Sequence, residues 1–195
     1  MTDARGRLLE LLRELSFARR HVVLASGRES DFFIDCKQTV LRAEGHVLVG
    51  GLMRDAVFSF PTRARAVAGV ELGGCPLASA VAYASFQTGR PLDAIYVRKD
   101  VKDHGSRRLL EGDGGLAPGA SVAIVEDVIT TGGSTLKAAE RLRAAGYALT
   151  GVVALVDRLE GGREALLAAG LAVEAIFTRD DFIPPATEGT SALPK

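Results

Sequence analysis

The chain has 195 residues, 47% of them hydrophobic, which fits one folded domain with a sizeable core and excludes global disorder. Its 24 basic and 24 acidic side chains balance, so general affinity for nucleic acid or membrane surfaces has no support. No apolar run approaches the roughly 18 residues of a membrane span, and neither a signal-peptide layout nor a disulfide framework is visible, so we expect a soluble cytoplasmic protein.

The first forty residues predict a small unit that precedes the main part of the fold. Leucines at helical spacing predict an amphipathic helix over residues 4–19. Two short strand patterns follow, at residues 21–24 and 32–36, with a turn at residues 26–30 between them. This hairpin-like order predicts that residues 1–40 form an N-terminal hood that covers a binding site.

From residue 43 onward, helix and strand patterns alternate. Strands are expected at residues 66–70, 93–97, 122–125, 148–156 and 173–177, and helices at residues 43–59, 77–87, 136–146 and 160–169. The alternation predicts an α/β fold with a mostly parallel central sheet and helices on both faces. Neither a repeat nor a linker divides the chain, so residues 1–195 are expected to form a single domain, with an irregular tail after residue 183.

The strongest functional signal is the stretch from residue 122 to residue 136. A buried strand leads to Glu126 and Asp127, and the loop Thr-Thr-Gly-Gly-Ser-Thr follows at residues 130–135. Glycines, hydroxyls and the N–H groups of a helix start make a phosphate cradle, while the two carboxylates can accept hydrogen bonds from a diol. Together they describe a site for a ribose 5-phosphate, without the lysine of a Walker A loop or the dinucleotide spacing. The alternative is an ordinary strand-to-helix loop in which Ser134 only caps the helix.

A second glycine-rich turn, at residues 71–76, joins an expected strand to an expected helix. The backbone N–H groups of Gly73 and Gly74 can bind pyrophosphate oxygens there, as a second phosphate site for the same ligand. We expect Cys75 in the same turn to be a small buried hydrophobic residue and not a nucleophile.

A basic segment spans residues 98–115 after the expected strand at residues 93–97. Its basic side chains are Arg98, Lys99, Lys102, His104, Arg107 and Arg108. Almost nothing in the segment is apolar enough to pack, so we expect an exposed loop that is mobile without ligand. A solvated charge run is one interpretation, but a loop of this length between buried strands is more often functional.

The stretch Val-Glu-Asp-Val-Ile-Thr-Thr-Gly-Gly-Ser at residues 125–134 resembles the phosphoribosyl diphosphate (PRPP) binding motif of type I phosphoribosyltransferases. With Ser-Gly-Arg-Glu-Ser and Phe-Phe-Ile-Asp in residues 26–35, and Arg-Lys-x-x-Lys-Asp-His-Gly at residues 98–105, the chain resembles the orotate phosphoribosyltransferase family. The resemblance implies transfer of the phosphoribosyl group from PRPP to orotate in pyrimidine biosynthesis, with Mg²⁺ as cofactor. It also implies a homodimer in which the loop of residues 98–115 reaches the partner's site.

The same resemblance assigns roles to single residues. PRPP contacts are implied for Gly73, Gly74, Arg98, Lys99, Lys102, His104, Glu126, Asp127, Val128, Ile129, Thr130, Thr131, Gly132, Gly133 and Ser134. Lys99, Lys102, His104 and Asp127 would be catalytic, and the three basic groups would neutralise the departing pyrophosphate. PRPP and water, more than any protein group, would hold the Mg²⁺.

Orotate contacts are implied for Phe32, Phe33, Thr130 and Arg158. The planar guanidinium of Arg158 suits the planar carboxylate of orotate, although a surface arginine at a strand end would look the same. By composition alone Phe32 and Phe33 are core residues, and the resemblance adds a ligand contact for one of them.

Three positions depart from the family pattern. Asp31 stands where many relatives have proline, and Ala25 and Gly73 stand where some have a lysine, so those cationic contacts are absent or come from elsewhere. Two alternatives share the fold: a purine-type phosphoribosyltransferase and a PRPP-sensing regulator. Arg158, the flap with Phe32 and Phe33, and the basic loop with Lys102 and His104 favour orotate over a purine. A regulator of nucleic acid would be expected to have a basic face.

Overall fold

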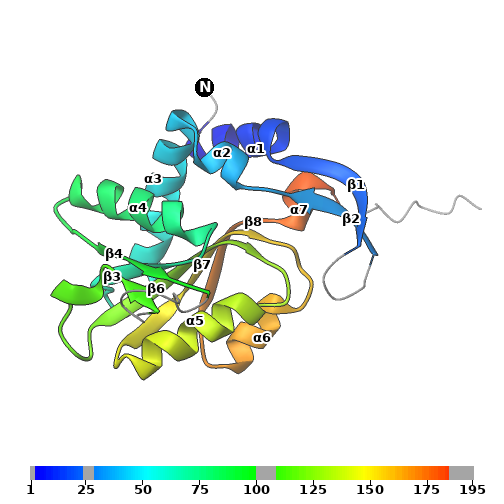
Figure 1. Cartoon of the computed structure of the whole chain (residues 1–195). Coiled ribbons are helices and arrows are strands. Elements are labelled where there is room, and N and C mark those ends of the chain that lie inside the picture. Colours follow the sequence, from blue (N-terminus) through cyan, green and yellow to red (C-terminus); the bar gives the residue numbers. More distant parts are fainter. Residues whose placement is uncertain (1–2, 24–28, 100–108, 185–195) are drawn as a thin grey trace, which may run out of the picture.

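The computed structural model describes residues 3–23, 29–99 and 109–184, and the main sheet within them has six strands (Figure 1). In spatial order the strands are β5 (Leu110–Glu111), β4 (Asp93–Val97), β3 (Ala66–Val70), β6 (Ser121–Ile129), β7 (Ala148–Asp157) and β8 (Val173–Thr178). The neighbouring pairs are parallel except β4 and β5, which are antiparallel. The predicted mostly parallel sheet is confirmed.

Helices cover both faces of this sheet (Figure 1). The helices α3 (Ala43–Ser59) and α4 (Gly74–Phe86) lie on one face, and α5 (Gly133–Ala144) and α6 (Gly162–Ala168) lie on the other. Successive residues of β6 therefore contribute to two separate cores, with Val125 in the first and Ile124 in the second. Burial on both faces explains why the strands read as continuous apolar runs.

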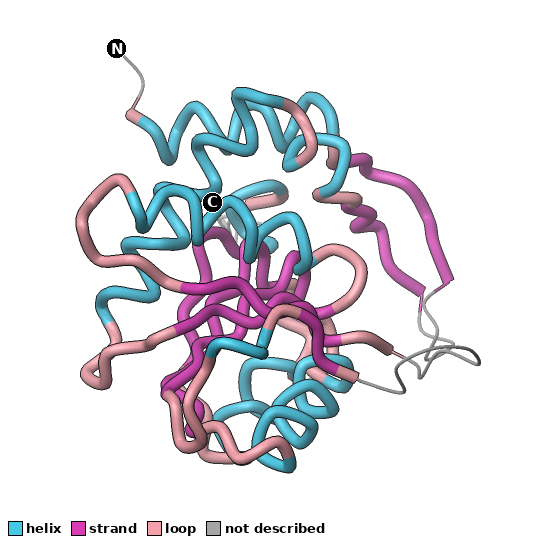
Figure 2. The backbone as a smooth tube through the Cα atoms, turned by 60° about the vertical axis from the view of Figure 1, so that its left-hand side comes forward, coloured by secondary structure: helices cyan, strands magenta, loops and turns pink. Residues whose placement is uncertain are grey.

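An N-terminal hood stands apart from the main sheet. It contains α1 (Ala4–Leu15), the antiparallel pair β1 (Phe17–Val23) and β2 (Glu29–Ile34), and α2 (Lys37–Val40). Figure 2 shows the two strands as a separate ribbon beside the main body. Aromatic rings tie the hood to α7 (Arg179–Phe182) near the chain end: the ring centroids of Phe17 and Phe32 lie 5.4 and 5.6 Å from that of Phe182. The N-terminal hood therefore packs against a helix from the C-terminal part of the chain.

Several predicted boundaries are wrong for reasons that lie in tertiary structure. The first helix ends at Leu15 instead of residue 19, because Phe17 already pairs with Ile34 between the hood strands. Helix α5 begins at Gly133 and not near residue 136, since Gly132 takes a left-handed conformation (φ 79°) that turns the chain directly into the helix. The short helices α2 and α7 were not predicted.

The basic loop is shorter than residues 98–115. Leu110 and Glu111 form β5 and pair with Val97 and Tyr96, and a 3-10 turn follows at Asp113–Gly115. The expectation that little in this span could pack is wrong for Leu110, because it forms part of β5 and is buried in the second core. No helix in the described part of the chain is both long and apolar enough to cross a membrane.

Candidate active site

The segments singled out in the sequence meet at the carboxyl edge of the sheet. The turn at residues 71–74 follows β3, the phosphate-cradle loop at residues 130–134 follows β6, and Arg158 follows β7. The three strands are adjacent and parallel, so their carboxyl ends lie side by side. The Arg158 backbone N–H donates to the Ile129 carbonyl (3.0 Å), which joins two of these segments directly.

Glu126 is buried at the base of the site, with 4% of its surface exposed. Its Oε2 accepts hydrogen bonds from the hydroxyls of Ser134 (3.3 Å) and Thr135 (3.1 Å), so it holds the first turn of α5 against the strand. Thr135 was predicted as part of the loop, but its buried contact with Glu126 was not. Burial, and then the neighbouring Asp127 carboxylate, raises the pKa of the Glu126 carboxyl to about 8. Glu126 therefore keeps its proton at neutral pH.

This raised pKa predicts a pH-dependent stability without ligand. Between about pH 4.5 and 8 the unfolded chain has lost the Glu126 proton and the folded chain has kept it. The free energy of unfolding should therefore fall as pH rises through this window, by at most about 1.4 kcal/mol per pH unit. Glu126→Gln should remove that component of the slope, whereas Glu140→Gln, at an exposed position on α5, should keep it. Urea unfolding at several pH values across this window measures the free energy of unfolding. If this free energy depended on pH equally in wild type and Glu126→Gln, the prediction would be contradicted.

Asp127 lies between three segments of the site. Its Oδ1 accepts the Val128 backbone N–H (2.9 Å), and its backbone carbonyl lies 3.9 Å from the Cys36 thiol of the hood. Its carboxylate packs against Gly73: a Cβ atom at Gly73 would lie 1.9 Å from Oδ2. A side chain at position 73 would therefore require the Asp127 carboxylate to move. Asp127 remains partly exposed, as a residue that binds a diol must be.

The phosphate-cradle loop turns its polar groups outward. Thr131, Gly133 and Ser134 are exposed, and the N–H groups of the first turn of α5 lie beside them. The Ile129 side chain is buried and the Val128 side chain packs against the first core, so a ligand contact from either would come from its backbone.

Arg158 lies under the hood, with 8% of its surface exposed. Its Nη2 donates to the Phe32 carbonyl (3.0 Å) and pairs with Glu160 Oε1 (2.8 Å). The Phe32 ring is fully buried in the first core, so the structure supports the core interpretation for Phe32. Phe33 is partly exposed, with the Arg20 guanidinium 3.7 Å from its ring centroid.

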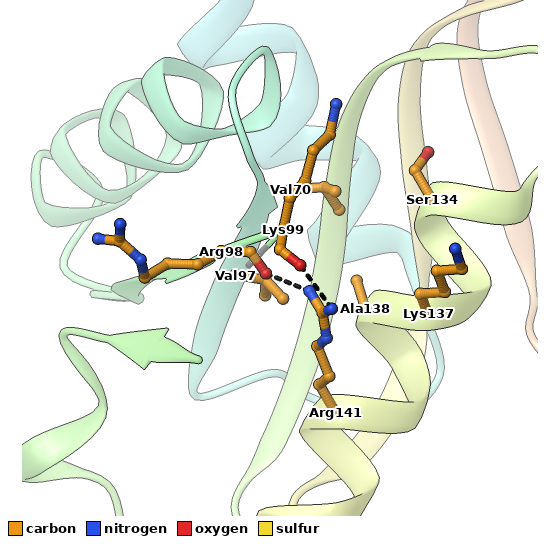
Figure 3. A pocket seen from close by; sticks show the side chains of 8 residues that line it. All are labelled: Val70, Val97, Arg98, Lys99, Ser134, Lys137, Ala138 and Arg141. Carbon is orange, nitrogen blue, oxygen red and sulfur yellow. Dashed lines mark hydrogen bonds between the residues drawn. The ribbon is translucent and has the colours of Figure 1, made fainter. Parts of the chain in front are cut away.

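A cavity of about 370 Å³ lies next to the phosphate-cradle loop, and Figure 3 shows the side chains that line it. It is lined by Val70, Val97, Arg98, Lys99, Ser134, Lys137, Ala138 and Arg141. Lys99 and Ser134 thus line the same cavity, whereas the Arg98 guanidinium points away from Ser134 and pairs with Glu111 Oε1 (3.4 Å). Lys137 and Arg141 were missed, although they follow Ser134 at a spacing that places all three on one side of α5.

Lys102 and His104 lie outside the described residues. Cys75 is buried, and burial raises the pKa of its thiol to about 11, which agrees with the prediction that it is not a nucleophile.

Comparisons with known proteins identify the family. A family model described as a phosphoribosyl transferase domain matches residues 42–166. The chain is 72% identical over 180 residues to an orotate phosphoribosyltransferase of Sorangium cellulosum, covering 92% of this chain and 93% of the relative. The chain belongs to the orotate phosphoribosyltransferase family. A Bradyrhizobium orotate phosphoribosyltransferase is 43% identical, over 92% of this chain and 97% of the relative.

Solved structures of orotate phosphoribosyltransferases share the fold. The Mycobacterium tuberculosis enzyme in complex with PRPP is 36% identical, with a TM-score of 0.76 over 92% of this chain and 99% of that chain. The Aeropyrum pernix enzyme is 30% identical, with a TM-score of 0.68 over 90% and 96%. An adenine phosphoribosyltransferase of Leishmania donovani has a TM-score of 0.63 over 99% and 89% but only 13% identity, and shows the fold alone.

Proposed function

We propose that the carboxyl edge of the sheet transfers the 5-phosphoribosyl group of PRPP to orotate, giving orotidine 5′-monophosphate and pyrophosphate. As a member of the orotate phosphoribosyltransferase family, the chain is a pentosyltransferase. One observation supports the assignment most directly: Asp127 lies near the carboxyl end of β6, the exposed phosphate-cradle loop follows this strand, and Arg158 follows the neighbouring parallel strand β7. A phosphate, a diol and a carboxylate-bearing base each meet a chemically matched group there.

In this proposal each segment holds one part of PRPP. The loop at residues 130–134 binds the 5-phosphate through backbone N–H groups and hydroxyls. Asp127 accepts hydrogen bonds from the ribose diol, and the protonated Glu126 below it fixes the start of α5. The turn containing Gly73 and Gly74 offers backbone N–H groups to the pyrophosphate.

Bond breaking places positive charge on the ribose C1 and negative charge on the leaving pyrophosphate. Lys99, at the edge of the cavity, is one cation that can neutralise the leaving group. Lys102 and His104 are the others, and His104 can also donate a proton. The roles of these two rest on the sequence motif.

The residues present fit Mg²⁺ held mainly by substrate and water. Within residues 3–23, 29–99 and 109–184, no three His, Cys, Asp or Glu side chains are grouped to hold a metal by themselves. Asp127 supplies a partly exposed carboxylate of the hard-oxygen type that Mg²⁺ prefers, and PRPP oxygens and water would complete the coordination. When bound, Mg²⁺ neutralises charge on the pyrophosphate oxygens.

We propose a homodimer that uses the outer face of α4. Tyr83 and Phe86 lie one turn apart on this helix and are 66% and 75% exposed, and Leu72 just before the helix is 63% exposed. Large exposed apolar side chains one helical turn apart, such as Tyr83 and Phe86, are typical of a protein interface. Leu72 and Gly74 lie at the other end of α4, in or directly after the pyrophosphate turn, so a second copy that covered the whole outer face of the helix would reach the active site.

Arg158→Ala tests base recognition. The lost charge-assisted contact is to the orotate carboxylate, so the KM for orotate should rise roughly 10- to 100-fold and the KM for PRPP much less. Steady-state kinetics with each substrate varied in turn measures both constants, and Arg158→Lys, which keeps the charge, should give a smaller increase. An equal rise for both substrates would instead assign Arg158 a structural role, through its bond to the Phe32 carbonyl.

A further inference from the structure

The peptide groups at the start of the basic loop are held from two sides. The Lys99 backbone N–H donates to Glu71 Oε2 (2.8 Å), and the Lys99 carbonyl accepts from Arg141 Nη2 (2.7 Å). Arg141 Nη1 also donates to the Arg98 carbonyl, so one guanidinium binds two successive carbonyls (Figure 3). Hydrogen bonds from or to an ionised group are roughly twice as strong as neutral ones.

The two holding residues come from the segments proposed to bind the two ends of PRPP. Glu71 opens the pyrophosphate turn after β3, and Arg141 lies on α5, the helix that begins in the phosphate-cradle loop. Lys99 lies beyond the last residue of β4, where sheet hydrogen bonding no longer fixes the backbone. The planar guanidinium presents its two Nη donors in a fixed fork that spans both carbonyls, a geometry that a lysine ammonium does not preset.

We propose that Arg141 and Glu71 are positioning residues that fix the backbone at Arg98 and Lys99 and thereby hold the Lys99 ammonium at the cavity beside Ser134. The inference rests on the proposed role of Lys99 toward the pyrophosphate. Arg141 and Glu71 do not touch the reacting atoms in this proposal, and they act only through Lys99. Misplacing a charged group by a small distance weakens its interaction with the transition state, so the effect should fall on kcat.

Arg141→Gln should lower kcat roughly 10-fold and change the KM for PRPP much less. The matched control is Arg143→Gln on the same helix, because the Arg143 guanidinium donates to the Ala169 carbonyl (3.3 Å), outside the cavity. Arg143→Gln should keep the wild-type kcat. A wild-type kcat in Arg141→Gln would overturn the proposal, as would equal losses in the two variants.

A double-mutant cycle shows whether Arg141 acts through Lys99. If it does, Arg141→Gln should lower the kcat of Lys99→Ala protein less than about twofold, because the group that it positions is gone. An equal loss in the Lys99→Ala and wild-type backgrounds would overturn the proposal. A wild-type kcat in Lys99→Ala itself would instead refute the proposed role of Lys99, so the two failures are distinguishable.

Glu71 gives a second test, which does not depend on the folding of Arg141 variants. Glu71→Gln keeps an oxygen that can accept the Lys99 N–H, whereas Glu71→Ala removes it. Glu71→Ala should therefore lower kcat more than Glu71→Gln. If both lower it equally, the hydrogen bond to Lys99 is not the cause and the positioning role of Glu71 is wrong.

Discussion

Replacing Lys102 by alanine is expected to lower kcat by roughly 10²–10³-fold, the loss typical of removing one preorganised electrostatic contact to a transition state. PRPP affinity should change much less, because the negative charge that Lys102 meets is greatest as the bond to pyrophosphate breaks. Steady-state kinetics and calorimetric PRPP binding measure the two effects. Arg63→Ala, at an exposed position just before β3 and hence at the opposite edge of the sheet, is the matched control. A parallel loss of kcat and PRPP affinity would contradict the assignment.

Lys102→Ala also tests whether two copies build each active site. Mixing inactive Lys102→Ala chains with inactive Asp127→Asn chains should form heterodimers with one intact composite site if the loop acts on the partner. Random exchange makes half of the dimers mixed, with one good site of two, so about a quarter of wild-type activity should return. No recovery, with subunit exchange verified independently, would mean that each chain supplies its own loop.

Gly162→Ala is expected to raise the KM for PRPP at least about 10-fold and to lower the free energy of unfolding by about 1–3 kcal/mol. A Cβ atom at Gly162 would lie 2.6 Å from the Thr130 carbonyl oxygen, 2.8 Å from the Gly132 nitrogen and 2.4 Å from Ile129 Cγ2. Two of these atoms belong to the backbone of the phosphate-cradle loop, so the loop itself must shift. The N–H groups aimed at the 5-phosphate would shift with it.

Gly51→Ala is the matched control for this substitution. Gly51 lies within helix α3, and a Cβ atom there would meet nothing within 4 Å. This variant should keep the KM for PRPP and gain up to about 1 kcal/mol of stability. An unchanged KM in a folded Gly162→Ala protein would show that α6 does not position the phosphate-cradle loop.

The sequence predicted the main sheet well because its central strands β3, β6 and β7 are largely buried on both faces. Strands β3 and β4 were both placed at their observed bounds. The errors arise where contacts between distant residues decide the conformation. Phe17 belongs to a strand because Ile34 pairs with it, and β5 exists because Leu110 packs in the second core. Neither contact leaves a periodic signal in the sequence.

In the site, too, residues in a local sequence pattern were predictable, whereas those defined by contacts between distant residues were not. Glu126, Asp127 and the phosphate-cradle loop were predictable because they are contiguous, and their order along the chain reproduces the order of groups on the ligand. The roles of Thr135 and Arg141 were not predictable, because Thr135 donates to Glu126 Oε2 and Arg141 donates to two carbonyls about forty residues away.

Orotate consumption in the presence of PRPP and Mg²⁺ tests the assigned reaction most directly. Loss of orotate absorbance is followed alongside parallel reactions in which adenine or hypoxanthine replaces orotate. We expect turnover with orotate, one pyrophosphate released per orotate consumed, and no turnover of either purine. Turnover of a purine without turnover of orotate would contradict the assignment and identify a purine-type phosphoribosyltransferase. PRPP binding without turnover of any base would identify a PRPP-sensing regulator.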